Sequence, residues 1–305
     1  MSTTTLDLIA APFTPFHPDR SLNLEAIDSY AQWLIRQGVK GVFVCGTTGE
    51  GALLTVQERK SIAQRWVQVA SGQLRIIVHV GHLCLADCRE LAAHAQAIGA
   101  NGTSCLAPFF FKPIDHFGLV DWCQQVAEAA PELPFYYYHI PSMTGFPIQV
   151  HSFLDAAASR IPNLAGVKFT HDDMSDLKLC VNHASGKNEI FFGRDEKLLS
   201  AIQLGVRAAV GSTYNYAAPL YLELNRAFHS GDLARAQQLQ ALAVQMIDLL
   251  GGYGGSSLAC FKRFMSHVAV DCGPTRLPLV DPDDAAFAEV LRRVDSSPLK
   301  KWLLA

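Results

Sequence analysis

Short apolar segments alternate with helical patterns along the first two thirds of this chain. Each segment has five to seven residues, which is typical of a strand that is covered on both faces. Most follow one another at intervals of roughly 25–35 residues, the size of one strand–helix unit. The predicted strands cover residues 8–13, 41–46, 76–81, 102–108, 134–140, 164–170, 189–193 and 208–212.

The segments between these strands carry helix start and stop signals. Thr55 and Glu58 have the spacing of a capping box, and the pattern that they open ends at Gly72. An earlier helical pattern ends in the same way at Gly38. The intervening segments are therefore predicted to be helices.

Eight strand–helix alternations leave two main architectures, an open doubly wound sheet and a closed barrel. A repeat count of eight favours the barrel, although the seventh unit is short. From Ala217 onward only helical patterns occur. We predict an α/β fold, a TIM (β/α)8 barrel over residues 1–230 with a C-terminal α-helical extension over residues 231–305.

Composition excludes several classes of partner. The chain has 305 residues, 50% of them hydrophobic and 17% charged, with a net charge of −3 and no long run of one sign. We therefore expect no nucleic-acid partner and no membrane association. Asp7 interrupts the only apolar stretch near the N-terminus, so no signal peptide is predicted. The eight cysteines are interpreted as buried free thiols, which predicts a cytoplasmic protein.

Lys168 is the strongest candidate for chemistry. It lies near the end of an otherwise apolar predicted strand, and lysine is almost never buried without a reason. Burial lowers the pKa of a lysine, which gives a neutral amine that can attack a carbonyl. The alternative is a structural lysine, paired with an acid or extending from the strand end.

Tyr138 is the third of three consecutive tyrosines in another predicted strand. Alternate side chains face opposite ways, so at least one hydroxyl is expected in or above the barrel interior. There it could relay protons for a neighbouring lysine. A core aromatic with a satisfied hydroxyl is the alternative.

Two loops after predicted strands carry polar groups. Residues 46–51, GTTGEG, offer backbone N–H groups and the hydroxyls of Thr47 and Thr48, which together could bind a carboxylate or phosphate. The alternative is a plain glycine-rich turn with a helix cap. Residues 193–196, GRDE, could bind a polyol, or Asp195 could cap the next helix.

A metal site is another possible use of the polar residues near one predicted strand end. Zinc ligands could come from His79, His82, Cys84 and Cys88. No acidic or histidine set elsewhere has obvious partner spacing, so we predict no metal.

Taken together, these motifs resemble the pyruvate-dependent Schiff-base aldolase superfamily that includes dihydrodipicolinate synthase and N-acetylneuraminate lyase. The resemblance covers essentially the whole chain. Within the superfamily the chain is most similar to the N-acetylneuraminate lyase branch. The resemblance to the superfamily rests on APFTPF, GTTGE, the YxxHIP-type end of the fifth predicted strand, GVKFT and GSTYN. The similarity to the lyase branch rests on APFFFKP, LPFYYYHIPSMTG and AAVGSTYNY.

The resemblance implies roles for individual residues. Lys168 would form the imine with a keto acid, and Tyr138 would relay protons. The pyruvate carboxylate would be held by Thr47 and Thr48. The sugar hydroxyls would be bound by Thr170, Gly193, Asp195, Glu196 and Ser212.

Two departures from relatives bear on the substrate. The synthase branch usually places an arginine where this chain has Met143, so a second substrate carboxylate would lack its partner there. Many relatives contribute a tyrosine across a subunit interface where this chain has Phe109, Phe110 and Phe111. No role for that tyrosine can be carried over.

The resemblance thus implies reversible cleavage of N-acetylneuraminate (sialic acid) to N-acetylmannosamine and pyruvate, without a cofactor, in a homotetramer. Another sugar-acid aldolase or dehydratase, of the 2-keto-3-deoxy type, would share the imine chemistry. A non-catalytic sugar-acid binding barrel would have no need of Lys168.

Overall fold

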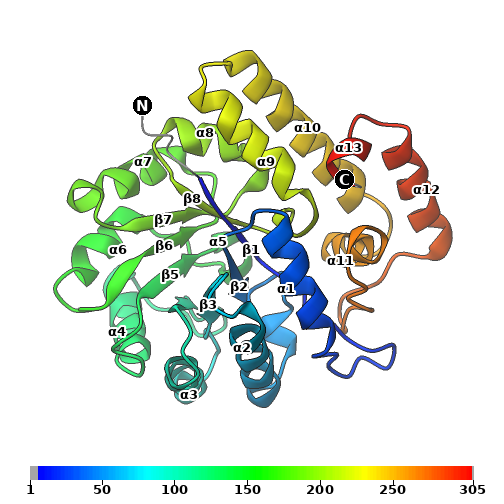
Figure 1. Cartoon of the computed structure of the whole chain (residues 1–305). Coiled ribbons are helices and arrows are strands. Elements are labelled where there is room, and N and C mark those ends of the chain that lie inside the picture. Colours follow the sequence, from blue (N-terminus) through cyan, green and yellow to red (C-terminus); the bar gives the residue numbers. More distant parts are fainter. Residues whose placement is uncertain (1–5, 304–305) are drawn as a thin grey trace.

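The computed structural model describes residues 6–303, apart from the side chains of residues 184 and 185. Eight parallel strands pair in sequence order, and the last pairs with the first, so the predicted closed barrel is confirmed (Figure 1). The strands are β1 (Asp7–Ala10), β2 (Gly41–Val44), β3 (Arg75–His79), β4 (Gly102–Leu106), β5 (Phe135–His139), β6 (Leu164–Phe169), β7 (Glu189–Phe192) and β8 (Ala208–Gly211).

Every predicted strand is present, but most end before the apolar segment does. The segment at 8–13, for example, leaves the sheet after Ala10. In a barrel the residues just beyond the carboxyl ends of the strands form the loops that carry function. Several residues just beyond the strand ends, among them Ala11, Thr170 and Ser212, line a cavity.

The predicted helices surround the barrel, and the short seventh unit is confirmed by the six-residue α8. The capping box is also confirmed, because the Thr55 and Glu58 side chains each accept a hydrogen bond from the other's backbone N–H. The helices of the barrel are α1 (Ala26–Arg36), η1 (Gly51–Leu53), α2 (Val56–Ala70), α3 (Leu85–Ala97), α4 (His116–Ala127), α5 (Pro141–Thr144), α6 (Val150–Ala157), α7 (Met174–Asn182), η2 (His183–Gly186), η3 (Asp195–Lys197) and α8 (Leu198–Gln203).

Helices alone follow β8, as predicted, and they gather on one side of the barrel (Figure 1). They are α9 (Tyr214–His229), α10 (Leu233–Gly251), α11 (Ser257–Val268), α12 (Asp284–Asp295) and α13 (Lys300–Leu303). The boundary proposed at 230/231 falls between α9 and α10 and stays a prediction. None of the helices within residues 6–303 is long and apolar enough to cross a membrane.

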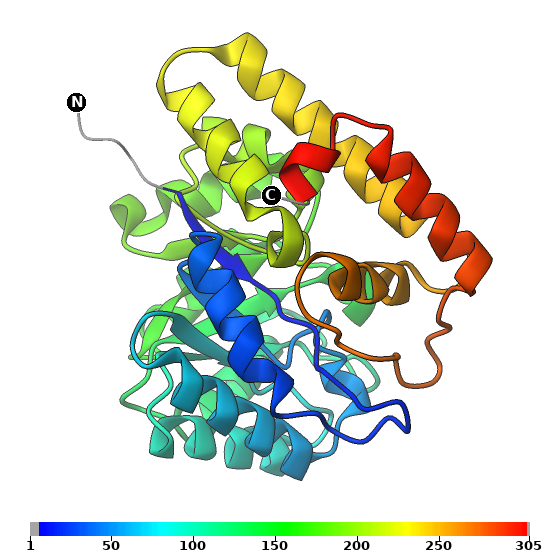
Figure 2. The ribbon, with the colours of Figure 1, turned by 45° about the vertical axis from the view of Figure 1, so that its right-hand side comes forward.

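The chain after α11 returns to the N-terminal segment of the barrel. The backbone N–H of Phe16 donates to the carbonyl of Cys272 at 3.0 Å, and Figure 2 shows the two segments side by side. This contact joins the helical extension to the loop that follows β1.

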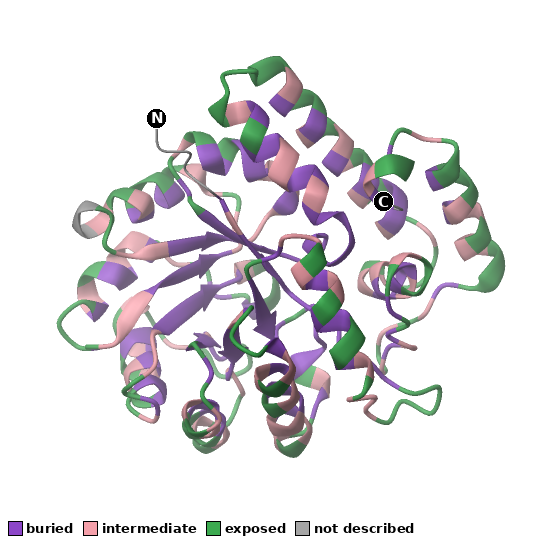
Figure 3. Cartoon of the chain, viewed as in Figure 1, coloured by how far each residue is buried: buried purple, intermediate pink, exposed green. Residues whose placement is uncertain are grey.

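Two apolar layers hold the fold together, one inside the barrel and one between the strands and the helices. The strands are buried along most of their length, whereas the helices expose their outer faces (Figure 3). Inside, Ile9, Phe43, Ile77 and Phe191 fill the tube. Tyr136 also points inward, but its hydroxyl bonds Glu189 Oε2 at 2.7 Å near the amino ends of the strands. The Tyr136 hydroxyl is therefore remote from the carboxyl ends of the strands, where the functional loops of a barrel lie.

Candidate active site

Lys168 and Tyr138 are neighbours in the barrel wall. β5 and β6 pair with Tyr138 opposite Lys168, and both residues are the last but one of their strands. The Lys168 nitrogen lies 4.0 Å from the centre of the Tyr138 ring and 4.1 Å from that of Phe43. Lys168 is only 4% exposed, and no described acid within 4.0 Å pairs with it among residues 6–303. The structural-lysine alternative of a salt bridge is therefore wrong.

The alternation predicted for the three tyrosines is confirmed. Tyr136 and Tyr138 belong to the interior layer, whereas Tyr137 packs outside the barrel against Phe153, with ring centres 4.6 Å apart. The Tyr138 hydroxyl is 3.3 Å from the Thr47 hydroxyl. Tyr138 is thus the tyrosine whose hydroxyl meets the loop after β2.

That loop, residues 46–51, is called the threonine loop below. It turns sharply, because Cys45 and Glu50 on either side of the threonines adopt left-handed backbone conformations with φ of 59° and 56°. Gly51 has to be glycine, since a Cβ there would lie 2.0 Å from the Cys45 carbonyl oxygen. The turn brings Thr47 and Thr48 to the mouth of the barrel beside Tyr138.

The opposite wall of the site carries free polar groups. Asp195 is buried, and its Oδ2 accepts hydrogen bonds from the Thr213 backbone N–H at 3.1 Å and hydroxyl at 2.5 Å. Its Oδ1 and the Thr170 hydroxyl, both buried, have no partner among the described residues. Thr213 therefore orients Asp195, and the unpartnered oxygens remain available to a bound molecule.

Two glycines keep these oxygens uncovered. A Cβ at Gly193 would lie 1.9 Å from the Thr170 hydroxyl, and one at Gly211 would lie 2.0 Å from Asp195 Oδ1. Glycine at both positions lets the strand ends approach the polar groups closely. The alternative reading of Asp195 as a helix cap is wrong, because its carboxylate bonds Thr213 rather than the start of α8.

Burial raises the pKa of Asp195 to about 6, and the hydrogen bonds from Thr213 act in the opposite direction. The neighbouring Glu196 is half-buried and pairs with Arg194, with 2.6 Å between Arg194 Nε and Glu196 Oε1. The two acids of the GRDE motif therefore differ, one buried with a free oxygen and the other held by an arginine.

A cavity of about 220 Å³ brings all nine sequence-predicted site residues together. They are Thr47, Thr48, Tyr138, Lys168, Thr170, Gly193, Asp195, Glu196 and Ser212. A second cavity of about 590 Å³ shares Thr47, Thr48 and Ser212 with the first and is lined mainly by apolar side chains. Lys168, Tyr138 and the free oxygens of Thr170 and Asp195 thus line the same cavity.

Sequence reasoning missed several residues of this space. Thr213 orients Asp195, and Phe43 lies under the Lys168 nitrogen. Ile247 of α10 and Phe261 of α11 complete the wall, so the helical extension is part of the site. Thr213 lies within the GSTYN motif and could have been found there, but the apolar side chains have no signal that separates them from core residues.

His79 is buried beside Tyr138, with 5.6 Å between the centres of the two rings. Burial holds its pKa well below the usual range, and the positive charge of Arg59 acts in the same direction. Arg59 donates hydrogen bonds to the carbonyl oxygens of His79 (2.5 Å) and Gly81 (2.8 Å). His79 therefore lines the larger cavity as an uncharged ring.

Two of the four residues that the sequence suggests as zinc ligands, His82 and Cys88, are engaged by neighbouring backbone groups. The His82 backbone N–H donates to Cys88 Sγ at 3.1 Å, and the Cys84 backbone N–H donates to His82 Nδ1 at 3.1 Å. Within residues 6–303, no three histidine, cysteine or acidic side chains are grouped so as to hold a metal ion.

Both departures noted in the sequence lie at the site's entrance. Met143 and Phe109 line the larger cavity, and Met143 is 65% exposed. Phe110 and Phe111, at 72% and 85%, are exposed on the surface of the single chain. The side chain that Met143 presents to the larger cavity is therefore apolar and carries no charge.

The chain is similar to known proteins over nearly its whole length. The model of the dihydrodipicolinate synthetase family matches residues 4–296. N-acetylneuraminate lyase of Gallus gallus is 42% identical over 293 residues, which are 95% of each chain. The solved structure of Proteus mirabilis N-acetylneuraminate lyase has a TM-score of 0.93 at 42% identity, covering 96% of this chain and 99% of the other. That of the Aliivibrio salmonicida enzyme (sialic acid aldolase) has a TM-score of 0.93 at 40% identity, covering 98% of both. The chain therefore belongs to the dihydrodipicolinate synthetase family.

Proposed function

We propose that the protein is a Schiff-base aldolase that reversibly cleaves N-acetylneuraminate to N-acetylmannosamine and pyruvate. The observation that carries the proposal is the buried Lys168 nitrogen, which faces the cavity beside Tyr138 and the threonine loop. Relatives at about 42% identity that cover nearly the whole chain carry this activity in their names.

The reaction begins at Lys168. Its free amine attacks the C2 carbonyl of the open-chain sugar acid, and loss of water leaves a protonated imine. The substrate carboxylate is held by the hydroxyls and backbone N–H groups around Thr47 and Thr48, which turns C2 toward the amine.

Bond cleavage follows from the electron demand of the imine. As the imine forms, Tyr138 gives its hydroxyl proton to the departing water and becomes a phenolate. The phenolate accepts the proton of the C4 hydroxyl, the C3–C4 bond breaks, and the electron pair of that bond moves into the enamine as N-acetylmannosamine leaves. Tyr138 then gives the proton to C3, and when water hydrolyses the imine to pyruvate and the free amine, the phenolate takes up the proton that is released. The 3.3 Å contact between the Tyr138 and Thr47 hydroxyls supports this relay role, because it keeps the phenol at the carboxylate end of the cavity.

The free oxygens on the opposite wall bind the sugar. Within residues 6–303, Asp195 Oδ1 and the Thr170 hydroxyl have no hydrogen-bond partner, so they are free to bond sugar hydroxyls. Glu196, Ser212 and the backbone at Gly193 line the same cavity and add to them. Met143 offers no partner to a second carboxylate, which favours a neutral polyol chain over a dicarboxylic product.

We also propose a homotetramer in the cytoplasm. Exposed apolar side chains at Phe110, Phe111 and Ile114 support association with other copies of the chain, and seven buried thiols suit a reducing compartment. Sedimentation analysis tests the tetramer, and imaging of the tagged protein tests the compartment.

The activity is tested by pyruvate release from a panel of sugar acids, followed with a coupled dehydrogenase. We expect N-acetylneuraminate to have the highest kcat/KM, with slower turnover of 2-keto-3-deoxy sugar acids. Preference for the latter would identify another aldolase or dehydratase on the same scaffold. Binding without turnover of any member would identify a non-catalytic barrel.

A further inference from the structure

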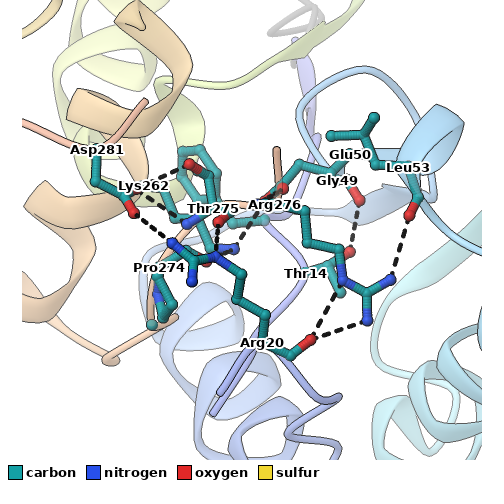
Figure 4. Close-up of polar contacts among 12 residues, drawn as sticks. Thr14, Arg20, Gly49, Glu50, Leu53, Lys262, Pro274, Thr275, Arg276 and Asp281 are labelled. Atoms are coloured by element: carbon teal, nitrogen blue, oxygen red, sulfur yellow. Dashed lines mark hydrogen bonds and ion pairs between the residues drawn. The ribbon is translucent and has the colours of Figure 1, made fainter. Parts of the chain in front are cut away.

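Glu50, the residue that closes the turn of the threonine loop, forms a fully buried ion pair with Lys262 of α11. Lys262 Nζ lies 2.7 Å from Glu50 Oε1, and neither side chain is exposed (Figure 4). The two residues are 212 positions apart in the sequence. The pair therefore ties the second strand–helix loop of the barrel directly to the helical extension.

The second carboxylate oxygen of Glu50 extends this connection. Oε2 accepts a hydrogen bond from the Arg276 backbone N–H at 2.8 Å, and Lys262 also donates to the Pro274 carbonyl at 2.8 Å. The Lys262 nitrogen lies 4.1 Å from the centre of the Phe16 ring. Both charges are thus fully satisfied, as a buried pair requires.

The contacts of Glu50 reach the substrate-facing residues through the backbone. The Glu50 N–H donates to the Thr47 carbonyl at 3.0 Å, which closes the turn that carries Thr47 and Thr48. The Thr14 hydroxyl donates to the Gly49 carbonyl at 2.6 Å from the other side. We call Thr14, Glu50 and Lys262 the loop clasp; neither Thr14 nor Lys262 lines the cavities at the site.

A contribution to stability alone does not account for the pair. Replacing a buried ion pair by apolar residues of similar volume is often neutral or stabilising. Glu50 in turn holds a left-handed backbone conformation, which a non-glycine residue keeps only when its surroundings impose it. The adjacent residue of α11, Phe261, lines both cavities, so the helix that supplies Lys262 is itself part of the site.

We propose that Glu50 and Lys262 are positioning residues for the reaction: by clamping the threonine loop to α11, they set the distance between the pyruvate carboxylate site and Lys168. The inference rests on the proposed Schiff-base function. Because a displacement of about 1 Å can cost about 100-fold in rate, a small shift of the loop is enough to matter. Loss of the pair should therefore weaken binding of the pyruvate unit more than binding of the sugar part of the substrate.

The test uses the full-length double variant Glu50→Gln/Lys262→Met, which removes both charges and keeps the volume. The readout is the pyruvate concentration that half-saturates borohydride trapping on the enzyme, together with the thermal midpoint. We expect the half-saturating concentration to rise about tenfold or more while the midpoint stays within about 5 °C. An unchanged concentration in the folded double variant overturns the proposal.

A matched control separates positioning from general loosening. Arg75 and Glu189 form an ion pair at the amino end of the barrel, with 2.7 Å between Arg75 Nη1 and Glu189 Oε1. The double variant Arg75→Met/Glu189→Gln should leave half-saturation within about twofold, since it is remote from the threonine loop. If the half-saturating pyruvate concentration rose equally in this control, loss of either ion pair would impair the site, and the proposal would be overturned.

A second variant decides the matter if the clasp double variant does not fold. Thr14→Val removes the hydrogen bond from the Thr14 hydroxyl to the Gly49 carbonyl. We expect the half-saturating pyruvate concentration to rise about threefold, and kcat and KM for the sugar acid to change in proportion. No change in this variant overturns the proposal. If the parent protein itself traps no pyruvate, the proposed function fails instead, which is a distinguishable outcome.

Discussion

The side-chain nitrogen of Lys168 lies 4.0 Å from the centre of the Tyr138 ring, and the two residues are paired on the adjacent strands β6 and β5. The strand register alone sets this neighbourhood, because paired residues in a parallel sheet point to the same face. Two strands thereby deliver the proposed nucleophile and the proposed proton carrier to one cavity. Several consequences can be measured.

Lys168→Met should abolish turnover without harming the fold. The amine is buried and has no acid partner among the described residues, so an apolar side chain of similar length fits the same space. We expect activity to fall by at least about 1,000-fold. The thermal midpoint should equal or exceed that of the parent. Substantial residual cleavage of N-acetylneuraminate would count against imine formation at this residue.

Tyr138→Phe removes the phenolic hydroxyl and leaves the ring that packs against Lys168 and Phe43. We expect kcat to fall about 100- to 10,000-fold, the usual range for loss of a proton-transfer group, with a smaller change in KM. Steady-state kinetics check both parameters. A variant with unchanged kcat would assign the relay to another group.

The KM for N-acetylneuraminate should depend on the charge of Asp195. Burial raises its pKa to about 6, so the carboxylate form that accepts hydrogen bonds from sugar hydroxyls is lost as the pH falls below that value. We expect KM to rise about tenfold per pH unit below about pH 6. Asp195→Asn should have a high KM that no longer varies over this range. A KM for the parent that stays constant between pH 5 and 7 would rule out this role.

Gly193→Ala should impair sugar binding specifically. The added Cβ would lie 1.9 Å from the Thr170 hydroxyl, which must then move out of place. We expect KM for N-acetylneuraminate to rise about tenfold while pyruvate trapping is unchanged. Gly72→Ala is a suitable control, because its φ of +76° makes alanine strained but no atom lies within 4 Å. It should lower stability by about 1 kcal/mol and leave KM alone.

Much of the architecture could be predicted from the sequence, because each strand–helix unit carries its own local signals. The buried runs, the Thr55–Glu58 capping box and the glycine stops are properties of neighbouring residues. The exact strand ends could not be predicted in this way. Ala11, for instance, is as apolar as a strand residue but lies in the wall of the cavity.

Residues of the candidate site could be predicted where a polar residue lies in an apolar segment, as Lys168 does, or where a family motif includes the residue. Contacts between segments that are distant in the sequence could not be predicted. Thr213 reaches Asp195 across the β7–β8 junction, and Lys262 reaches Glu50 over 212 residues. Nothing in the local sequence of α11 distinguishes Lys262 from a solvated lysine, since its partner is set by how the extension packs on the barrel.

Covalent trapping tests the central claim most directly. The protein is incubated with pyruvate and reduced with borohydride, and the adduct is then located by peptide mass mapping. We expect a single modified residue, Lys168, with no adduct when pyruvate is omitted. An adduct on a different lysine, or none at saturating pyruvate, would contradict imine formation at Lys168.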